Sequence, residues 1–361
     1  MKTTLRNGLQ ALVFGGIGVS ILLLVYNHQN TAYVAECGRN SIAPAECNLL
    51  AKLVTDFTHV DFRWIAAVLL GYVASTVSRA CKWMLLLQPL GFKPRFANTF
   101  LAVCIAYFAN LGLPRVGDFV RAGLMARYER IPVERVLGTI VADRTVDLLF
   151  LGAVMTLALV LEFDRISGFV AGRGSLPGGA AWVAVGAIGL TLVVLLAVLL
   201  VVFRQRLATT GIYQQTSGRL VGFRAGLRSI RRLQHPVWFV LHNVNIWLLS
   251  FLMTWMSLQA FAPTAALDLR AALTVFVFAT LGIVVPSPGG MGTFHLLVIS
   301  ALTLFYGVRG DDAFSAANIF FFSVNVGFTI VLGLLSLAAL PLINRRGPLD
   351  PAQRSGALTG S

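Results

Sequence analysis

The stretch Asn110–Asp147, NLGLPRVGDFVRAGLMARYERIPVERVLGTIVADRTVD, decides how this chain folds, because it places dense charge between strongly apolar runs. Three cations and three anions in it could neutralise one another: Arg115, Asp118, Arg121, Asp143, Arg144 and Asp147. A charge at the middle of a membrane costs roughly 2.5–3.5 kcal/mol on insertion scales, so such residues usually face a cavity or a partner. The stretch therefore predicts a polar site inside a lipid-embedded protein, next to a helix break at Pro114–Gly117.

The composition of the whole chain is that of a membrane protein. Of its 361 residues, 57% are hydrophobic and 12% are charged, and the mean hydropathy is +0.78. Soluble domains carry about 25% charged residues. The formal net charge of +14 fits the excess of lysine and arginine in cytoplasmic loops, and we expect no nucleic-acid partner. Leu9–Tyr26 lacks a small-residue cleavage site after it, which predicts a retained first helix.

Six apolar runs are long enough to cross the ~30 Å hydrocarbon layer. They are Leu9–Tyr26, Trp64–Leu90, Leu137–Leu161, Ala180–Phe203, Val237–Phe261 and Phe314–Pro341. Two further regions, Phe96–Tyr128 and Leu273–Tyr306, are apolar but broken by proline and glycine. Most of their arms hold about 11 to 14 residues, which reach roughly 17–21 Å as helix. These arms are too short to cross, so each broken region is predicted to enter and leave the membrane on the same side.

The arm Phe96–Leu113 alone is long enough to leave this ambiguous, and the distribution of charge decides between the alternatives. With two re-entrant hairpins, the basic loops Lys82–Arg95, Arg204–Arg232 and Arg345–Arg354 all lie in the cytoplasm with the amino terminus. A single crossing by Phe96–Leu113 would move Arg204–Arg232 outside, against the positive-inside tendency. The sequence thus predicts an all-α polytopic membrane protein with six transmembrane helices and two re-entrant helical hairpins. We expect it in the plasma (inner) membrane as a multi-pass protein with both termini cytoplasmic.

The same order of elements then occurs twice, in opposite orientations. Residues 1–165 form a first repeat of two transmembrane helices, a hairpin from the cytoplasm and a third helix. Residues 176–343 form an inverted repeat whose hairpin enters from outside, and residues 344–361 form a disordered tail. Inverted repeats with broken helices are common in transporters. Cys37 and Cys47 lie in the first loop, and a tentative disulfide between them is expected if that loop is extracytoplasmic.

The first candidate site centres on two carboxylates. Asp143 and Asp147 are four residues apart, so in a helix they share a face and would repel one another if both were ionised and dry. Arg115 and Arg121 on the preceding hairpin are the expected neutralising cations. Two interpretations stay open: the charges bind a lipid headgroup, or they form an ion-pair network that only fixes the hairpin to the next helix.

The second candidate site is the break at Pro286–Gly292. Gly289, Gly290 and Gly292 would let the backbone approach a ligand closely. A helix beginning near Thr293 would direct its amino-terminal dipole into the membrane, where it favours phosphate. His295 could titrate or bind phosphate, or it could simply be a packing residue. The five histidines show no metal-ligand spacing, and no metal and no cofactor is expected.

Two motifs resemble a known family. Leu113–Asp118 with Arg121, followed by Ala142–Arg144 with Asp147, is similar to the lysylphosphatidylglycerol synthase transmembrane-region family, the flippase-like domain of multiple peptide resistance factor proteins. Pro288–Phe294 resembles that family's second signature. The family usually has Glu where this chain has Asp118 and Asp143, and often Glu where it has His295. The sequence contains no aminoacyl-transferase domain, so the resemblance implies a stand-alone member that translocates lipid without lysyl transfer.

We therefore expect a lipid flippase or transporter that moves a polar-headed phospholipid between leaflets. The expected partners are membrane lipids with anionic or zwitterionic headgroups; a second copy of the chain and lipid-synthesis enzymes are the protein partners considered. One alternative is a membrane-embedded lipid-modifying enzyme that uses Asp143, Asp147 or His295 as acid–base groups. Another is a non-catalytic scaffold of a lipid-synthesis complex.

Overall fold

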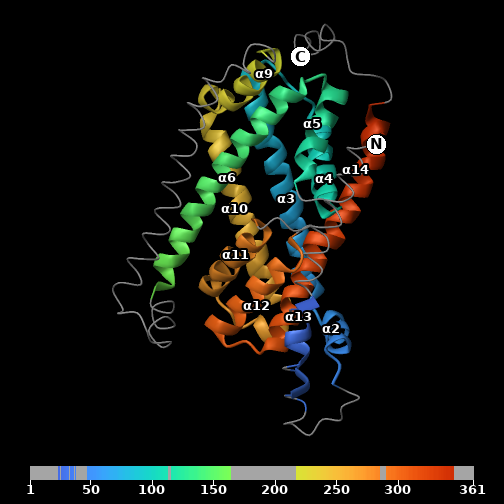
Figure 1. Cartoon of the computed structure of the whole chain (residues 1–361), viewed down its shortest axis with the longest axis vertical. Helices are drawn as coiled ribbons and strands as arrows, with labels where there is room; N and C mark the ends of the chain where they lie inside the picture. Colours follow the sequence, from blue (N-terminus) through green and yellow to red (C-terminus); the bar gives the residue numbers. More distant parts are fainter. Residues whose placement is uncertain are drawn as a thin grey trace.

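The computed structural model describes residues 47–112, 115–163, 217–284 and 290–344, together with residues 23–37 except 25, 32 and 36. Every regular element in this described part is helical (Figure 1). The predicted all-α class is therefore confirmed.

Four helical segments of the described part are long and apolar enough to cross a membrane. They are α3 (Phe62–Leu87) with the short 3₁₀ turn that follows it, α6 (Val133–Leu161), α10 (Pro236–Gln259), and the continuous segment formed by α13 (Gly310–Phe320), the π-helix η6 (Phe321–Phe328) and α14 (Thr329–Ile343). These segments match four of the six predicted runs. The run Ala180–Phe203 and most of Leu9–Tyr26 lie outside the described residues.

Side chains on the outside of these segments are apolar, as a lipid environment requires. Leu149 of α6 is 56% exposed, and Leu335 of α14 is 61% exposed. Many exposed large apolar side chains would be a liability in water, whereas hydrocarbon accepts them. The helices therefore present an apolar surface to their surroundings while polar side chains point inward.

Two helical hairpins enter this bundle from opposite ends (Figure 1). The first consists of α4 (Phe96–Gly112) and α5 (Val116–Glu129), and the second of α11 (Leu269–Val284) and α12 (Thr293–Tyr306). At 1.5 Å per residue, these helices are about 21–26 Å long, shorter than the ~30 Å hydrocarbon layer. Both hairpins turn near the middle of the long axis, where the predicted Pro/Gly breaks lie.

Close glycine contacts allow each hairpin to fold back on itself. In the first hairpin, a Cβ on Gly117 would collide with the carbonyl oxygen of Ala106, and the Gly117 amide donates to Asn110 Oδ1 at 2.8 Å. In the second, a Cβ on Gly282 would lie 2.7 Å from the Cα of Phe294. Both pairs of helices are therefore packed backbone to backbone, which only glycine permits.

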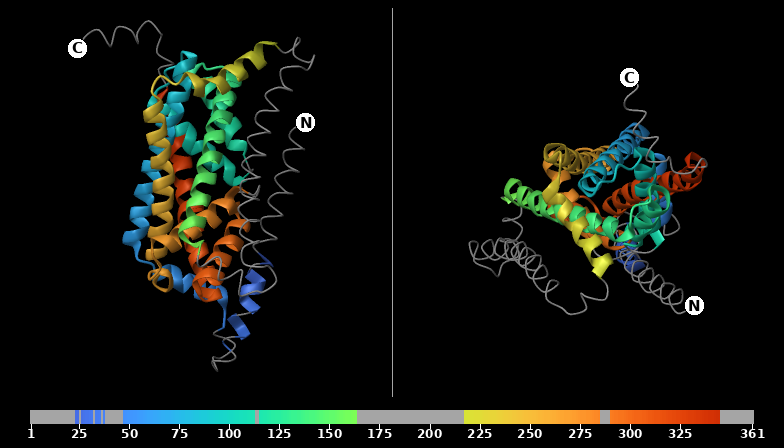
Figure 2. Two further views of the ribbon diagram at one scale, coloured as in Figure 1. Left: turned by 90° about the vertical axis from the view of Figure 1, so that its left-hand side faces the viewer. Right: turned by 90° about the horizontal axis from the view of Figure 1, so that it is seen from above.

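The two halves of the chain pack against one another through their long helices and their hairpins. The longest contact joins α3 and α10, which lie side by side along the bundle (Figure 2). The first hairpin packs on α14 through α4, and the second packs on α6 through α11. Each hairpin thus packs against the last long helix of the other half of the chain.

Two peripheral helices complete the described structure. At the end that carries α5, α9 (Ser217–Arg228) crosses α6, where a Cβ on Gly138 would lie 2.9 Å from the Cα of Gly226. At the opposite end, α2 (Leu49–Thr58) contacts α13, and Lys52 bonds Asp56 at 2.7 Å and Asp312 at 2.8 Å. Burial disfavours the charged form of Lys52, but these two bonds outweigh that effect and raise the pKa of the ammonium.

The first loop contains both cysteines of the tentative disulfide. Cys37 is a buried thiol that forms no disulfide in the structure, and Cys47 is also buried. Formation of the disulfide in an oxidising compartment stays a prediction, which thiol-counting mass spectrometry under denaturing, non-reducing conditions would test.

Candidate functional site

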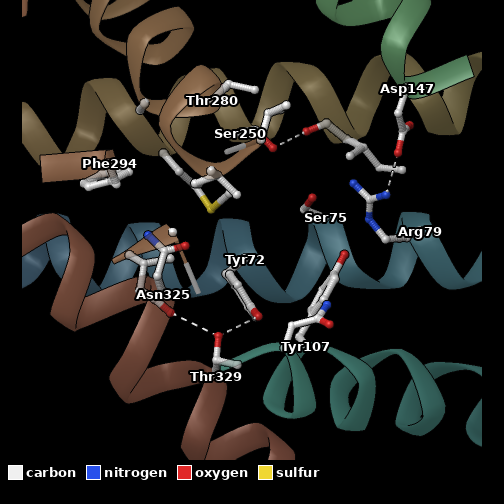
Figure 3. A pocket seen from close by; sticks show the side chains of 18 of the residues that line it. Tyr72, Ser75, Arg79, Tyr107, Asp147, Ser250, Thr280, Phe294, Asn325 and Thr329 are labelled. Carbon is white, nitrogen blue, oxygen red and sulfur yellow. Dashed lines mark hydrogen bonds and ion pairs between the residues drawn. The ribbon is translucent and has the colours of Figure 1, made fainter. Parts of the chain in front are cut away.

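A cavity of about 560 Å³ lies in the centre of the bundle, where the two hairpins approach one another (Figure 3). Its walls come from α3, α4, α5, α6, α10, α11, α13, η6 and α14, from Gly290 in the turn before α12, and from Phe294 in the first turn of α12. Ligand pockets typically measure about 300–1,000 Å³. The cavity therefore has room for the polar headgroup of a lipid, and both hairpins and all of the long helices contribute to it.

One end of the cavity is charged, and Lys82 organises it. This lysine of α3 is fully buried, and its Nζ lies 2.7 Å from Asp143 Oδ1 and 2.8 Å from Asp147 Oδ1. It also donates to Asn243 Oδ1 of α10 at 2.7 Å. Asp147 receives a second cation, because Arg79 Nη1 lies 3.1 Å from its Oδ2. The two neighbouring carboxylates can both be ionised because Lys82 bridges them and Arg79 adds a charge.

The prediction that Arg115 and Arg121 neutralise these two carboxylates is wrong. The partners are Lys82 and Arg79, three residues apart on one face of α3. Lys82 was assigned to a cytoplasmic loop because it begins a basic stretch in the sequence. The sequence signal for these partners is the spacing of Arg79 and Lys82. Two cations one helical turn apart within an apolar run indicate that anions lie nearby in the folded protein.

A second ionic group joins the first hairpin to α6. Asp118 Oδ1 lies 3.2 Å from Arg144 Nη2 and 3.6 Å from Arg121 Nη2. Arg121 is 4% exposed, and its guanidinium lies 4.2 Å from the ring centroid of Trp83. A cation over an indole face is stabilised by the ring quadrupole. Arg121 therefore holds α5 against α3, while Arg144 and Asp118 face the cavity.

The charges around the cavity do not cancel, in contrast to the expectation of a self-neutralising set. Five cations contribute +5: Arg79, Lys82, Arg115, Arg121 and Arg144. Three anions contribute −3: Asp118, Asp143 and Asp147. The sum is +2. Arg115 lines the cavity and makes no ion pair with any residue that the structure describes.

The second hairpin contributes less than the sequence suggested. Gly290 lines the cavity in a left-handed conformation, with φ of 83°. Thr293 instead closes the turn, because its Oγ1 donates to the carbonyl of Gly282 at 2.6 Å. Gly292, which precedes α12 as its N-cap, does not line the cavity. Gly289 lies outside the described residues.

His295 also lies away from the cavity. It is fully buried, and its ring centroid lies 4.6 Å from that of Phe321 and 5.7 Å from that of Phe294. Neither ring nitrogen makes a hydrogen bond of good geometry in the described part of the chain, although the side chain of Asn318 lies close to the ring. These surroundings are those of a packing residue, in agreement with the second of the two interpretations of His295.

The other end of the cavity is uncharged but carries hydroxyl, amide and aromatic groups (Figure 3). The Ser250 and Thr280 hydroxyls donate to carbonyls of their own helices, at 2.8 and 2.7 Å, which leaves their oxygen lone pairs as acceptors. Tyr72 and Thr329 bond one another at 3.0 Å. Asn325 projects from the π-helix η6, a backbone irregularity that is common at functional sites. None of these wall residues was anticipated from the sequence.

The fold and the cavity define the class of the protein: a multi-pass helical membrane protein with a charged, lipid-headgroup-sized cavity between two helical hairpins. The chain belongs to the family described as "Lysylphosphatidylglycerol synthase TM region", whose profile matches residues 49–333. This confirms the resemblance carried by the two sequence motifs. No curated protein and no solved structure shows significant similarity to the chain.

Proposed function

We propose that this protein translocates a polar-headed lipid between the two leaflets of its membrane. The observation that carries the proposal is the central cavity, which has a charged end, an uncharged polar end and an apolar exterior around it. A headgroup in the cavity would exchange hydration water for protein dipoles and charges, while its acyl chains stay in lipid. Lowering the cost of moving the polar headgroup is what a lipid translocator has to do.

The arrangement of the hairpins supports an alternating route for the lipid. We infer that both hairpins are re-entrant, α4–α5 from the cytoplasm and α11–α12 from outside, and that residues 1–165 and 176–343 are inverted repeats. Their reciprocal packing on α14 and α6 is what such a repeat produces. Rocking one hairpin and its partner helix against the other would expose the cavity to each leaflet in turn.

The geometry favours translocation over acid–base catalysis. Asp143 and Asp147 are held by Lys82, and Asp147 also by Arg79, so both carboxylates already have cationic partners. His295 is outside the cavity lining. Asp147 lines the cavity, but both of its oxygens are already engaged by cations of α3, which favours a binding role over proton transfer. The sequence has no Walker loop, and we propose that transport is downhill or coupled to an ion.

Reconstitution into sealed vesicles tests the proposal. Proteoliposomes would carry a fluorescent phospholipid in both leaflets, and dithionite would reduce the fraction reached from outside. Protein-dependent movement should make nearly all of the probe reducible, whereas protein-free vesicles should protect about half. Arg79→Gln should slow this movement because Asp147 keeps Lys82 but the cavity loses a cation.

Arg127→Gln is the matched control, because this arginine of α5 is exposed and does not line the cavity. Both variants should elute as monodisperse protein before reconstitution. Chemical conversion of a lipid in detergent would support the enzyme alternative. If the protein neither converts nor moves any lipid of a test panel, only the scaffold alternative remains and the proposal is overturned.

A further inference from the structure

The acidic residues at the cavity already have cationic partners, whereas one cation has no anionic partner among the residues that the structure describes. Asp143 and Asp147 contact Lys82, and Asp118 contacts Arg144. Arg115 lines the same cavity without an ion pair to any described residue. The charge that is missing from the site is therefore negative, and a bound headgroup has to supply it.

We infer that the lipid carries an anionic, hydroxyl-bearing headgroup, with its phosphate at Arg115 and its hydroxyls against the uncharged polar wall. This rests on the proposed function, since it names the substrate class of the same cavity. Phosphatidylglycerol and phosphatidylinositol are headgroups of this chemistry. Lipids whose headgroup ends in an amine are not.

The anionic part follows from the balance of charges around the cavity. The eight charged groups around the cavity sum to +2, from five cations and three anions. A guanidinium binds phosphate through several N–H donors in a fixed plane. Arg79 and Arg144 each donate one hydrogen bond from a terminal nitrogen to an aspartate, at 3.1 and 3.2 Å, and their other N–H groups are still available as donors. A phosphate would thus complete the charge balance and find donors already in place.

An ammonium headgroup meets the opposite situation. Each aspartate that it could contact already binds at least one lysine or arginine at 3.2 Å or less. The incoming cation would have to displace one of these groups or share its carboxylate in a region of excess positive charge. Like charges at such distances in a site of low dielectric disfavour binding.

The hydroxyl part follows from the other wall of the cavity. Ser250 and Thr280 present acceptor lone pairs, because their own O–H groups are used on helix carbonyls. Ser75 and Asn325 point into the cavity (Figure 3) and make no hydrogen bond with the described residues. A hydroxyl group can donate to the first pair and both donate to and accept from Asn325. A bare phosphate ester has no O–H donor and would leave the acceptor oxygens of Ser250 and Thr280 without partners.

Competition binding to the purified, full-length protein tests the inference without requiring transport. The probe is radiolabelled dihexanoylphosphatidylglycerol below its micelle concentration, displaced by unlabelled lipids with the same chains. Phosphatidylglycerol should compete best. Phosphatidylmethanol, which has the same charge but no headgroup hydroxyl, should compete several-fold less well. Phosphatidylcholine and the cationic O-ethylphosphatidylcholine should compete least.

Two variants separate the two parts of the inference. Arg115→Asn should weaken binding of phosphatidylglycerol roughly tenfold, the effect of losing one hydrogen bond to a charged group. Arg130→Asn is its matched control: Arg130 lies at the other end of α5, is exposed, and is the second non-glycine residue with positive φ among the described residues. Asparagine tolerates this conformation at both positions. Asn325→Leu should abolish the preference for phosphatidylglycerol over phosphatidylmethanol.

The outcomes distinguish this inference from the proposed function. Phosphatidylcholine competing as well as phosphatidylglycerol, or unchanged binding by a folded Arg115→Asn protein, would overturn the anionic assignment even if vesicles show transport. Equal competition by phosphatidylglycerol and phosphatidylmethanol would overturn the hydroxyl assignment. Selective binding without movement of any lipid in vesicles would instead overturn translocation and leave an anionic-lipid site.

Discussion

At the scale of single residues, Lys82 has the largest influence on the site. Its ammonium is fully buried and has three oxygen partners, Asp143, Asp147 and Asn243, at 2.7–2.8 Å. These come from two other helices, so one side chain joins α3, α6 and α10. Two of these contacts, to Asp147 and Asn243, are hydrogen bonds, and the third is an ion pair with Asp143. Paired in this way, a charge can be kept in an apolar bundle.

Removal of Lys82 should therefore destabilise the fold more than removal of the whole pair. Lys82→Met leaves Asp143 as a buried charge without its partner, which typically costs about 3–5 kcal/mol. Lys82→Met with Asp143→Asn removes both charges, while Asp147 keeps Arg79, and should recover most of the lost stability. Thermal unfolding in detergent, with Lys93→Met as an exposed control, measures this. A wild-type Tm for Lys82→Met alone would contradict the bridging role.

His295 shows how a polar residue near a motif can serve packing. Its ring is surrounded by Phe294, Phe321 and Phe322, and its nitrogens make no hydrogen bond of good geometry in the described structure. Leaving a buried polar group unsatisfied costs about 1–3 kcal/mol. We expect His295→Phe to keep or raise the Tm and to retain lipid translocation. Loss of translocation by a well-folded His295→Phe protein would show that the imidazole acts chemically.

At the scale of elements, the two hairpins determine where the cavity forms. Each is held by a glycine whose Cα touches the backbone of the opposite arm, Gly117 in the first and Gly282 in the second. The turn of the first hairpin adds strain, because Arg115 adopts φ of 62° before α5 begins. A non-glycine residue rarely adopts this conformation and often does so at functional sites. The same strained residue supplies the cavity with its cation that lacks an ion pair.

Alanine at two glycines of α5 should separate hairpin packing from helix propensity. Gly117→Ala places a methyl group against the Ala106 carbonyl, with the Asn110 side-chain oxygen 2.8 Å away. It should destabilise the protein by about 1–3 kcal/mol, as overpacking does. Gly123→Ala on the same helix meets no atom within 4 Å and should leave stability unchanged or raise it by about 0.5–1 kcal/mol. Equal Tm values for the two variants would argue against a tightly packed hairpin.

At the scale of the whole molecule, the two hairpins and the long helices give the bundle two chemically different ends. The end with α5 and α9 carries many arginines, including Arg127, Arg228 and Arg232. The opposite end carries Asp56, Asp311 and Asp312 around Lys52. The positive-inside tendency predicts that the first end faces the cytoplasm.

Cysteine labelling in intact cells tests this orientation. In a background without the four native cysteines, a membrane-impermeant maleimide should label Ala266→Cys, which lies in the exposed turn between α10 and α11. Arg224→Cys in α9 should be labelled only after permeabilisation. External labelling of position 224 would mean that one of the hairpins crosses the membrane.

The sequence by itself determined the positions of the membrane-spanning helices and of the helix breaks, because these depend on local properties of the chain. Hydropathy located α3, α6, α10 and the segment from α13 to α14, since an apolar run of sufficient length is stable in hydrocarbon whatever its neighbours are. The Pro/Gly breaks located both hairpin turns, because proline and glycine act on the local backbone. The charged motif also contained four residues that line the cavity: Arg115, Asp118, Arg144 and Asp147. A fifth, Arg121, forms an ion pair with the lining residue Asp118.

Only the tertiary structure decided which charges meet. Arg79 and Lys82 lie about 65 residues before Asp147 in the chain, and they became its partners because α3 packs against α6. The same holds for the polar wall, where Ser75, Ser250, Thr280 and Asn325 converge from four elements. Ion pairs and cavity walls depend on which helix faces pack against one another. That packing depends on two helices at once, so the sequence pattern of a single segment does not predict it.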